Sequence, residues 1–197
     1  MSIGKTKNIE YINRKRQTYY LHQSQTKTGK PKYFFSLKKE GILVNTVPDG
    51  WEIYENPNAQ VFLRKIRPKL ITDEEINIVK KGLEEFGQLK YHLIEVKDDT
   101  ITIYVADQDV DALTKILESF PLVTPSKITE AINNSLSYSP MMRFILIDKN
   151  RRVFGSQRYC FRGSIDDWEW IGLPDQLEKI VKEFVKHLGQ DSYYELF

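Results

Sequence analysis

The first third of the chain is a series of short strand-forming segments separated by turn residues, and this pattern limits the folds open to it. Residues 17–23 are rich in strand-forming side chains, residues 26–31 hold a glycine and a proline, and residues 32–37 form a second strand-like segment. Two such segments around a turn that contains Gly29 and Pro31 predict a β-hairpin. Residues 51–55 then alternate apolar and polar side chains, which is the period of a half-buried strand. We therefore predict an antiparallel β meander over residues 17–66.

Helix signals begin just after this region. Thr72 and Glu75 form a capping box, in which each side chain bonds the other residue's backbone at the start of a helix. Beyond it, segments with strand and helix periods are mixed. The fold class that follows is α+β, with an N-terminal antiparallel β meander and then a mixed α+β body with a C-terminal helix. We divide the chain into a basic arm (1–16), an antiparallel β region (17–66) and an α+β domain (71–197).

The C-terminal part of the chain predicts a turn followed by that last helix. Residues 164–167, Ser-Ile-Asp-Asp, are typical of a turn or a helix start. Pro174 suits the first position of a helix, because its missing N–H would have no partner there. The apolar stripe within residues 177–188 is one face of the helix that follows.

Composition is that of a folded protein of one or two small domains. Of 197 residues, 41% are hydrophobic and 28% are charged, an ordinary globular balance. No apolar run approaches the roughly 20 residues of a membrane-spanning helix, and the N-terminus lacks the apolar segment of a secretory signal. Cys160 is the only cysteine, so no internal disulfide can form. We expect a cytoplasmic protein with no membrane partner.

Charge is spread unevenly along the chain. Residues 1–40 hold ten Lys or Arg and two Asp or Glu, a net charge of +8, whereas the remaining residues carry a net charge of −6. A basic segment beside an acidic body indicates an anionic partner for the basic segment. The alternative is that the basic segment lies against acidic groups of the same chain.

The predicted hairpin combines lysines with aromatic rings. Aromatic faces stack on nucleobases and lysines neutralise phosphates, so such a hairpin is typical of a nucleic-acid contact. Alternation leaves only one face of the hairpin for a ligand, because the other must cover a core. The alternative is an amphipathic hairpin with a solvated, lysine-rich tip. The residues that we assign to nucleic-acid binding are Lys27, Lys30, Lys32 and Lys38 for the phosphates, with Tyr20 and Phe34 for stacking.

A second hypothesis is a metal-dependent nuclease. Glu95 and Lys97 are two residues apart on a predicted strand, and Asp49 is the candidate for an acid on a neighbouring strand. In such nucleases the carboxylates hold a divalent ion and the lysine helps to activate water. The alternative is that these residues are only the polar end of a β-hairpin.

Other signals of catalysis are missing from the sequence. The three histidines are far apart and Cys-x-x-Cys does not occur. Neither a phosphate-binding glycine loop nor a serine-nucleophile motif is present. We therefore expect no metal site built from histidine or cysteine, no bound cofactor, and a protein that binds a partner in preference to one that catalyses a reaction.

Trp168 and Trp170 support a third hypothesis, a protein–protein contact. They follow a pair of aspartates, and tryptophan is enriched at the residues that contribute most to protein interfaces. The partner would be another protein or a second copy of this chain.

Two segments resemble an uncharacterised bacterial protein family. One is Tyr-Tyr-Leu-His at residues 19–22 with Thr-Gly-Lys-Pro-Lys-Tyr-Phe-Phe-Ser at residues 28–36, and the other is Pro-Asp-Gly-Trp-Glu-Ile-Tyr-Glu-Asn-Pro at residues 48–57. The resemblance covers the first third to half of the chain. It implies a bacterial cytoplasmic protein and carries no catalytic residues.

Overall fold

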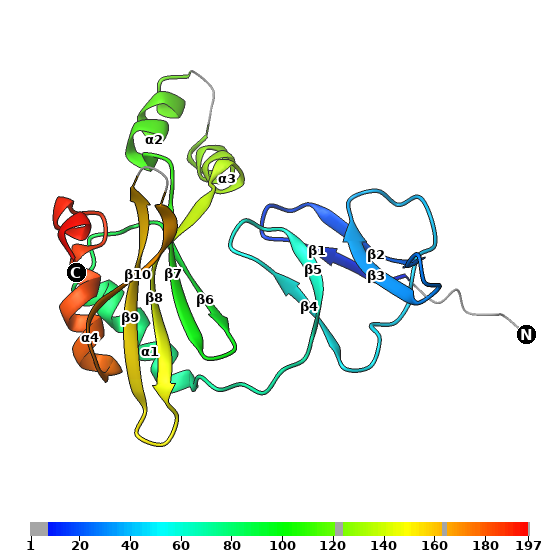
Figure 1. The fold of residues 1–197 in the computed structure, drawn as a ribbon. Helices are drawn as coiled ribbons and strands as arrows, with labels where there is room; N and C mark the ends of the chain where they lie inside the picture. Colours follow the sequence, from blue (N-terminus) through cyan, green and yellow to red (C-terminus); the bar gives the residue numbers. More distant parts are fainter. Residues whose placement is uncertain (1–7, 121–123, 163–164, 197) are drawn as a thin grey trace, which may run out of the picture. The chain divides into compact units, whose positions relative to one another are not determined.

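The computed structural model describes residues 8–120, 124–162 and 165–196. The chain divides into two compact units (Figure 1): unit 1 holds residues 1–67 and 122–135, and unit 2 holds residues 68–121 and 136–197. Antiparallel sheets and helices are both present, so the predicted α+β class is confirmed. Charge follows the same division, because unit 1 has 14 Lys or Arg against 6 Asp or Glu, and unit 2 has 15 against 21. Unit 1 therefore carries a net charge of +8 and unit 2 one of −6.

Unit 1, as described, contains two small antiparallel sheets and one helix. Its elements are β1 (Glu10–Ile12), β2 (Thr18–Gln25), β3 (Pro31–Ser36), β4 (Trp51–Glu55), β5 (Val61–Lys65) and α3 (Pro125–Ser135). The first sheet has the order β1-β2-β3, the second pairs β4 with β5, and β3 lies against β5. Gly29 adopts a positive φ of 77° in the β2–β3 turn, where Lys30 N–H donates to the Thr26 hydroxyl (3.1 Å). The predicted hairpin is confirmed.

Part of the predicted basic arm, residues 1–16, is a strand. Residues 10–12 form β1 and pair with β2. So short a segment has no strand pattern of its own, and the pairing depends on the free edge that β2 offers. Between β3 and β4, Leu43 forms an isolated antiparallel bridge with His22 of β2.

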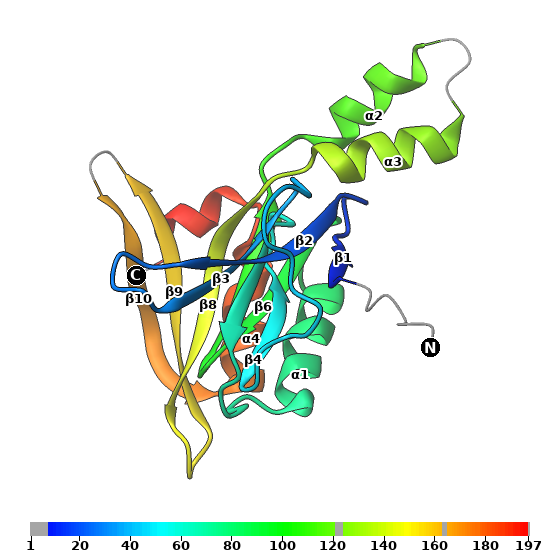
Figure 2. The same cartoon turned by 90° about the vertical axis from the view of Figure 1, so that its right-hand side faces the viewer.

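Unit 2 is one antiparallel sheet with helices on one face. Its elements are α1 (Asp73–Glu85), β6 (His92–Lys97), β7 (Thr100–Ala106), α2 (Val110–Glu118), β8 (Tyr138–Asp148), β9 (Val153–Arg162), β10 (Ile165–Gln176) and α4 (Leu177–Phe184), followed by 3₁₀ turns at Val185–His187 and Asp191–Glu195. The strand order is β10-β9-β8-β7-β6. Helices α1 and α4 pack on each other, and α4 contacts β9 and β10, so both cover the same face of the sheet (Figure 2). In the part of the chain that the structure describes, no helix is long and apolar enough to cross a membrane.

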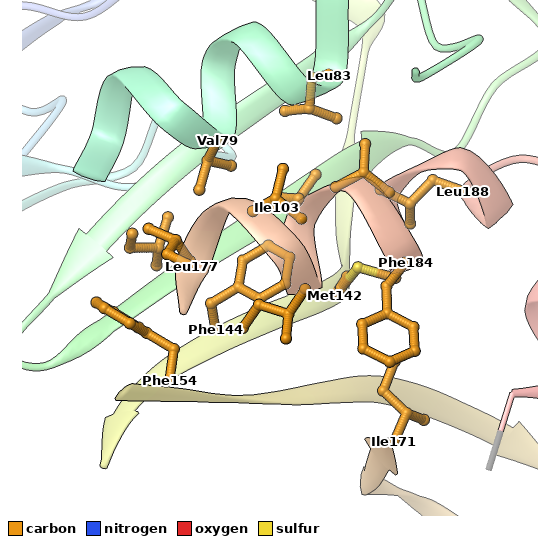
Figure 3. Close-up of a cluster of buried hydrophobic side chains, with 14 of the residues drawn as sticks. Val79, Leu83, Ile103, Met142, Phe144, Phe154, Ile171, Leu177, Phe184 and Leu188 are labelled. Carbon is orange, nitrogen blue, oxygen red and sulfur yellow. The ribbon is translucent and has the colours of Figure 1, made fainter. Parts of the chain in front are cut away.

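The core of unit 2 lies between the sheet and these two helices (Figure 3). Val79 and Leu83 of α1 and Phe184 of α4 belong to the same cluster as Met142 and Phe144 of β8, and none of the five is more than 4% exposed. Four-residue spacing puts the two α1 side chains on one helical face. Two-residue spacing puts the two β8 side chains on one side of the sheet. The helical and strand spacings of apolar residues in the sequence therefore place these side chains in the core.

Helix α1 begins with the predicted capping box. Glu75 N–H donates to the Thr72 hydroxyl (3.3 Å), and Thr72 N–H donates to the Glu75 carboxylate (2.8 Å). Glu75 is buried, and its carboxylate also accepts a hydrogen bond from Arg152 Nε (2.8 Å) in the β8–β9 turn. The capping residue therefore also ties the helix to the sheet.

The structure differs from two predictions at the C-terminal end. A turn or a helix start was expected at residues 164–167; residue 164 lies outside the described residues, and residues 165–167 belong to strand β10. Pro174 lies within β10, and helix α4 begins at Leu177. β10 is an edge strand, in which the missing N–H of proline is tolerated. Gly172, at a φ of 61°, allows the strand to bend near a register shift before the helix.

Tyr193 fastens the C-terminal segment to the sheet. Regular pairing of β8 with β9 stops at Met142 and Arg158, and the Tyr193 hydroxyl lies beside the point where the strands separate. This hydroxyl accepts a hydrogen bond from Tyr159 N–H (3.0 Å) and lies within donating distance of the carbonyl oxygens of Met141 and Tyr159. It satisfies backbone groups that the sheet leaves unpaired.

Tyr193→Phe is expected to lower the free energy of unfolding by about 1–3 kcal/mol, because the partner of a Tyr159 N–H is removed. Burial raises the pKa of the Tyr193 phenol above its ordinary value of 10.0. The wild-type contribution is therefore complete below that value and is lost as the pH rises beyond it. The Phe variant lacks this alkaline loss. Urea unfolding at neutral and alkaline pH measures both effects, and Tyr194→Phe, at an exposed position, is the control. Equal stability of Tyr193→Phe and wild type would show that the hydrogen bonds of the Tyr193 hydroxyl do not stabilise the sheet.

Candidate nucleic-acid interface

The four lysines predicted to contact phosphate lie on the β2–β3 hairpin or directly after it. Lys27 is in the turn, and Lys30 is at the end of the turn. Lys32 is on β3, and Lys38 follows β3. Together these are the hairpin lysines. All four are exposed, and none forms an ion pair with a carboxylate of the described residues.

Other cations of unit 1 do have carboxylate partners within the unit. Arg64 Nε lies 2.8 Å from a Glu52 carboxylate oxygen, and Lys39 Nζ lies 3.8 Å from one of Glu10. No acidic residue occurs in the sequence between Glu10 and Glu40, a stretch that contains all of β2, β3 and the hairpin lysines. The positive charge of the hairpin is therefore uncompensated locally, and it attracts anions.

Phe34 is the predicted stacking residue with the more accessible ring. In register it pairs with His22 across β2 and β3, and the two rings are 14° from parallel with centroids 5.3 Å apart. His22 is 4% exposed, and its Nε2 lies 2.8 Å from the Lys38 carbonyl oxygen. Phe34 itself remains 38% exposed. A fixed histidine thus supports a ring that is open to solvent, which lowers the entropy lost when a planar ligand binds.

Tyr20 belongs to the same face of the hairpin but is less available for stacking. It is half-buried, and it lies opposite Ser36 in register. The Lys39 ammonium group lies 5.2 Å from the Tyr20 ring centroid, within range of a cation–π contact. An internal cation therefore competes for the Tyr20 ring.

A second ring pair lies on the β4–β5 hairpin and was not assigned from the sequence. Tyr54 and Phe62 are opposite each other in register, with centroids 6.4 Å apart and planes 28° from parallel. Phe62 is 45% exposed, and the Arg64 guanidinium carbon lies 4.2 Å from the Tyr54 ring centroid. Alternation in residues 51–55 indicated the strand, but only the cross-strand register brings these rings together.

The candidate nuclease residues belong to different units. Asp49 is exposed in the turn before β4 of unit 1, whereas Glu95 and Lys97 lie on β6 of unit 2. Glu95 accepts a hydrogen bond from the Tyr104 hydroxyl (2.9 Å), and burial, with the Glu95 charge, raises the pKa of that phenol. Among the residues with a described position, no group of three or more His, Cys, Asp or Glu could hold a metal ion. The nuclease hypothesis stays a prediction.

Trp168 and Trp170 lie on β10 and differ in their availability. The Arg143 guanidinium carbon is 4.2 Å from the Trp168 ring centroid, and the Tyr159 ring meets Trp168 edge-on at 5.1 Å. Trp170 packs over Gly155, where an added Cβ would lie 2.6 Å from the indole, yet Trp170 is 56% exposed. Of the two, Trp170 offers the larger free surface, and the protein–protein contact stays a prediction.

Unit 1 therefore presents uncompensated lysines and two supported, accessible rings. No family model, curated protein or solved structure matches this chain. The functional assignment accordingly depends on the geometry of this surface.

Proposed function

We propose that this chain is a nucleic-acid-binding protein and that the β2–β3 hairpin of unit 1 makes the contact. In this proposal the hairpin lysines bind the phosphate backbone, and neighbouring aromatic rings contact bases. The observation that supports it most is that the hairpin lysines are exposed and have no ion pair among the described residues, while Arg64 and Lys39 are paired.

The placement of these lysines favours a polymeric anion. They extend from the turn, along β3, to the residues after it. At about 3.3 Å per residue, the six residues of β3 alone span roughly 20 Å. Charges spread over that length suit a regularly charged backbone better than one small anion, which is bound by converging groups.

Salt dependence is the first test of this proposal. Full-length protein is titrated into labelled single-stranded DNA, single-stranded RNA and duplex DNA at several salt concentrations, with and without magnesium. Each phosphate contact contributes about 0.7–0.9 to the slope of log affinity against log salt, so replacing all four hairpin lysines by alanine should reduce the slope by about 3. Affinity at low salt should fall by about a hundredfold or more.

A matched control removes four exposed lysines from unit 2. They are Lys80, Lys81, Lys149 and Lys186, each replaced by alanine. This variant changes the net charge by the same amount and should bind nearly as well as wild type. Salt-insensitive binding, or equal weakening of both variants, would show that the hairpin is not the contact. Magnesium-dependent cleavage that Glu95→Ala abolishes would favour the nuclease hypothesis.

A further inference from the structure

We infer that the ligand is single-stranded nucleic acid, and that Phe34 and Phe62 are two stacking residues for its unpaired bases. This inference rests on the proposed function for the phosphate contact. It adds the class of nucleic acid and a residue, Phe62, outside the basic hairpin. The observation that supports this inference is that two exposed phenylalanine rings each pack against a second ring on a neighbouring strand.

Both rings lie on the outer side of their strands. Leu21 is fully buried and faces Phe35 in register, so Phe34 projects to the opposite side of β3. Val61 is 4% exposed, so the next residue, Phe62, projects away from the buried side of β5. β3 and β5 lie against each other. Neighbouring strands of one unit therefore each present an outward ring.

Each ring has a support that restricts its movement. His22 backs Phe34 at 5.3 Å and is itself held by the Lys38 carbonyl. Tyr54 backs Phe62 at 6.4 Å. Rings ordered before binding lose less entropy when a base stacks on them.

The cations beside the two rings have different roles. Lys32 is two residues from Phe34 on the same side of β3, about 7 Å along the strand, and has no ion pair among the described residues. It is placed to bind the phosphate next to a base stacked on Phe34. Arg64 is bound by Glu52 (2.8 Å) and packs on Tyr54, so it stabilises the second ring pair.

Stacking on a protein ring distinguishes single strands from duplexes. The faces of paired bases are covered by their neighbours in a duplex, whereas unpaired bases can turn onto an aromatic side chain. Lysine–phosphate contacts form with both kinds of nucleic acid and do not discriminate strongly. Two outward rings on neighbouring strands, one of them on the same strand as Lys32, therefore favour the single strand, whether DNA or RNA.

The test compares single strands and duplex of one sequence, about 16 nucleotides long, by fluorescence anisotropy with the full chain. Wild type should bind single-stranded DNA or RNA about tenfold or more tightly than the duplex. Phe34→Leu and Phe62→Leu keep an apolar side chain but remove the flat ring, and each should weaken single-strand binding about tenfold. Duplex binding and the salt slope should hardly change. Phe34→Tyr and Phe62→Tyr should retain affinity, and Leu37→Ala controls for lost exposed apolar surface.

Each outcome is decisive. Equal affinity of wild type for single strand and duplex overturns the inference without using any variant. Folded Leu variants, checked by circular dichroism, that bind single strands as wild type does also overturn it. In both cases the proposed function survives if the hairpin-lysine variant still binds weakly. If wild type binds no nucleic acid in a salt-dependent way, both are wrong, and a protein partner for the two rings becomes the better assignment.

Discussion

Glu75→Ala should lower the free energy of unfolding of unit 2 by about 2–4 kcal/mol. The Glu75 carboxylate accepts hydrogen bonds from the Thr72 N–H (2.8 Å) and from Arg152 Nε (2.8 Å). Its removal leaves a helix-terminal N–H without its cap and a guanidinium without its counter-charge. Arg152 is 35% exposed in its side chain, so water compensates part of the loss. Urea unfolding followed by circular dichroism measures the change.

Glu74→Ala is the matched control for this prediction. Glu74 is in the same first turn of α1 but is exposed. Its loss removes only a favourable interaction with the helix dipole, about 0.5 kcal/mol. Glu75→Gln should be intermediate, because an amide oxygen still accepts the capping hydrogen bond but carries no charge for Arg152. If Glu74→Ala and Glu75→Ala were equally destabilising, helix capping and the link to the sheet would not be the cause.

Gly82→Ala should destabilise unit 2 by about 1–3 kcal/mol even though alanine is the better helix former. Gly82 is buried in α1 at its contact with α4, where an added Cβ would lie 2.1 Å from Val181 Cγ1. Val181 is 2% exposed and β-branched, so its side chain has little freedom to move aside. Overpacking therefore outweighs a gain in helix propensity of about 1 kcal/mol.

A double-mutant cycle tests the cause of this loss. Val181→Ala alone should cost about 1–2 kcal/mol because it leaves a cavity. In the double variant the new methyl group enters that space, so the combined cost should be less than the sum of the two, by about 1–3 kcal/mol. Asn77→Ala, exposed on the same helix, should change stability by no more than about 0.5 kcal/mol. Strictly additive costs would show that the two helices do not meet at this pair.

Elements with a strong local signal were predicted well. The Gly-Pro hairpin and the capping box depend on a few adjacent residues, so their chemistry is visible in a short window of sequence. Features that the sequence did not predict arise where a distant segment decides the local structure. β1 is a strand because the edge of β2 is free, and Pro174 lies in a strand because β10 extends along β9.

The candidate site also combines residues that the sequence predicted with contacts that only the structure shows. Lys27 and Lys30 were recognised from the composition of the turn, and the structure places them at the surface. The contact between Phe34 and His22 can be recognised only from the pairing register of β2 with β3. The contact between Phe62 and Tyr54 likewise depends on the pairing register of β4 with β5. Neither follows from the spacing of residues along one strand.

The sequence by itself determined that this chain folds as α+β, that its N-terminal part is strongly basic, and that a lysine-rich hairpin lacks acidic neighbours, because each of these depends on local composition and period. Only the tertiary structure decided which charges are neutralised and which rings are supported. Ion pairs and ring contacts join residues far apart in the chain. The sequence predicted that Glu75 caps helix α1, whereas only the structure shows that Glu75 also links this helix to the sheet through Arg152.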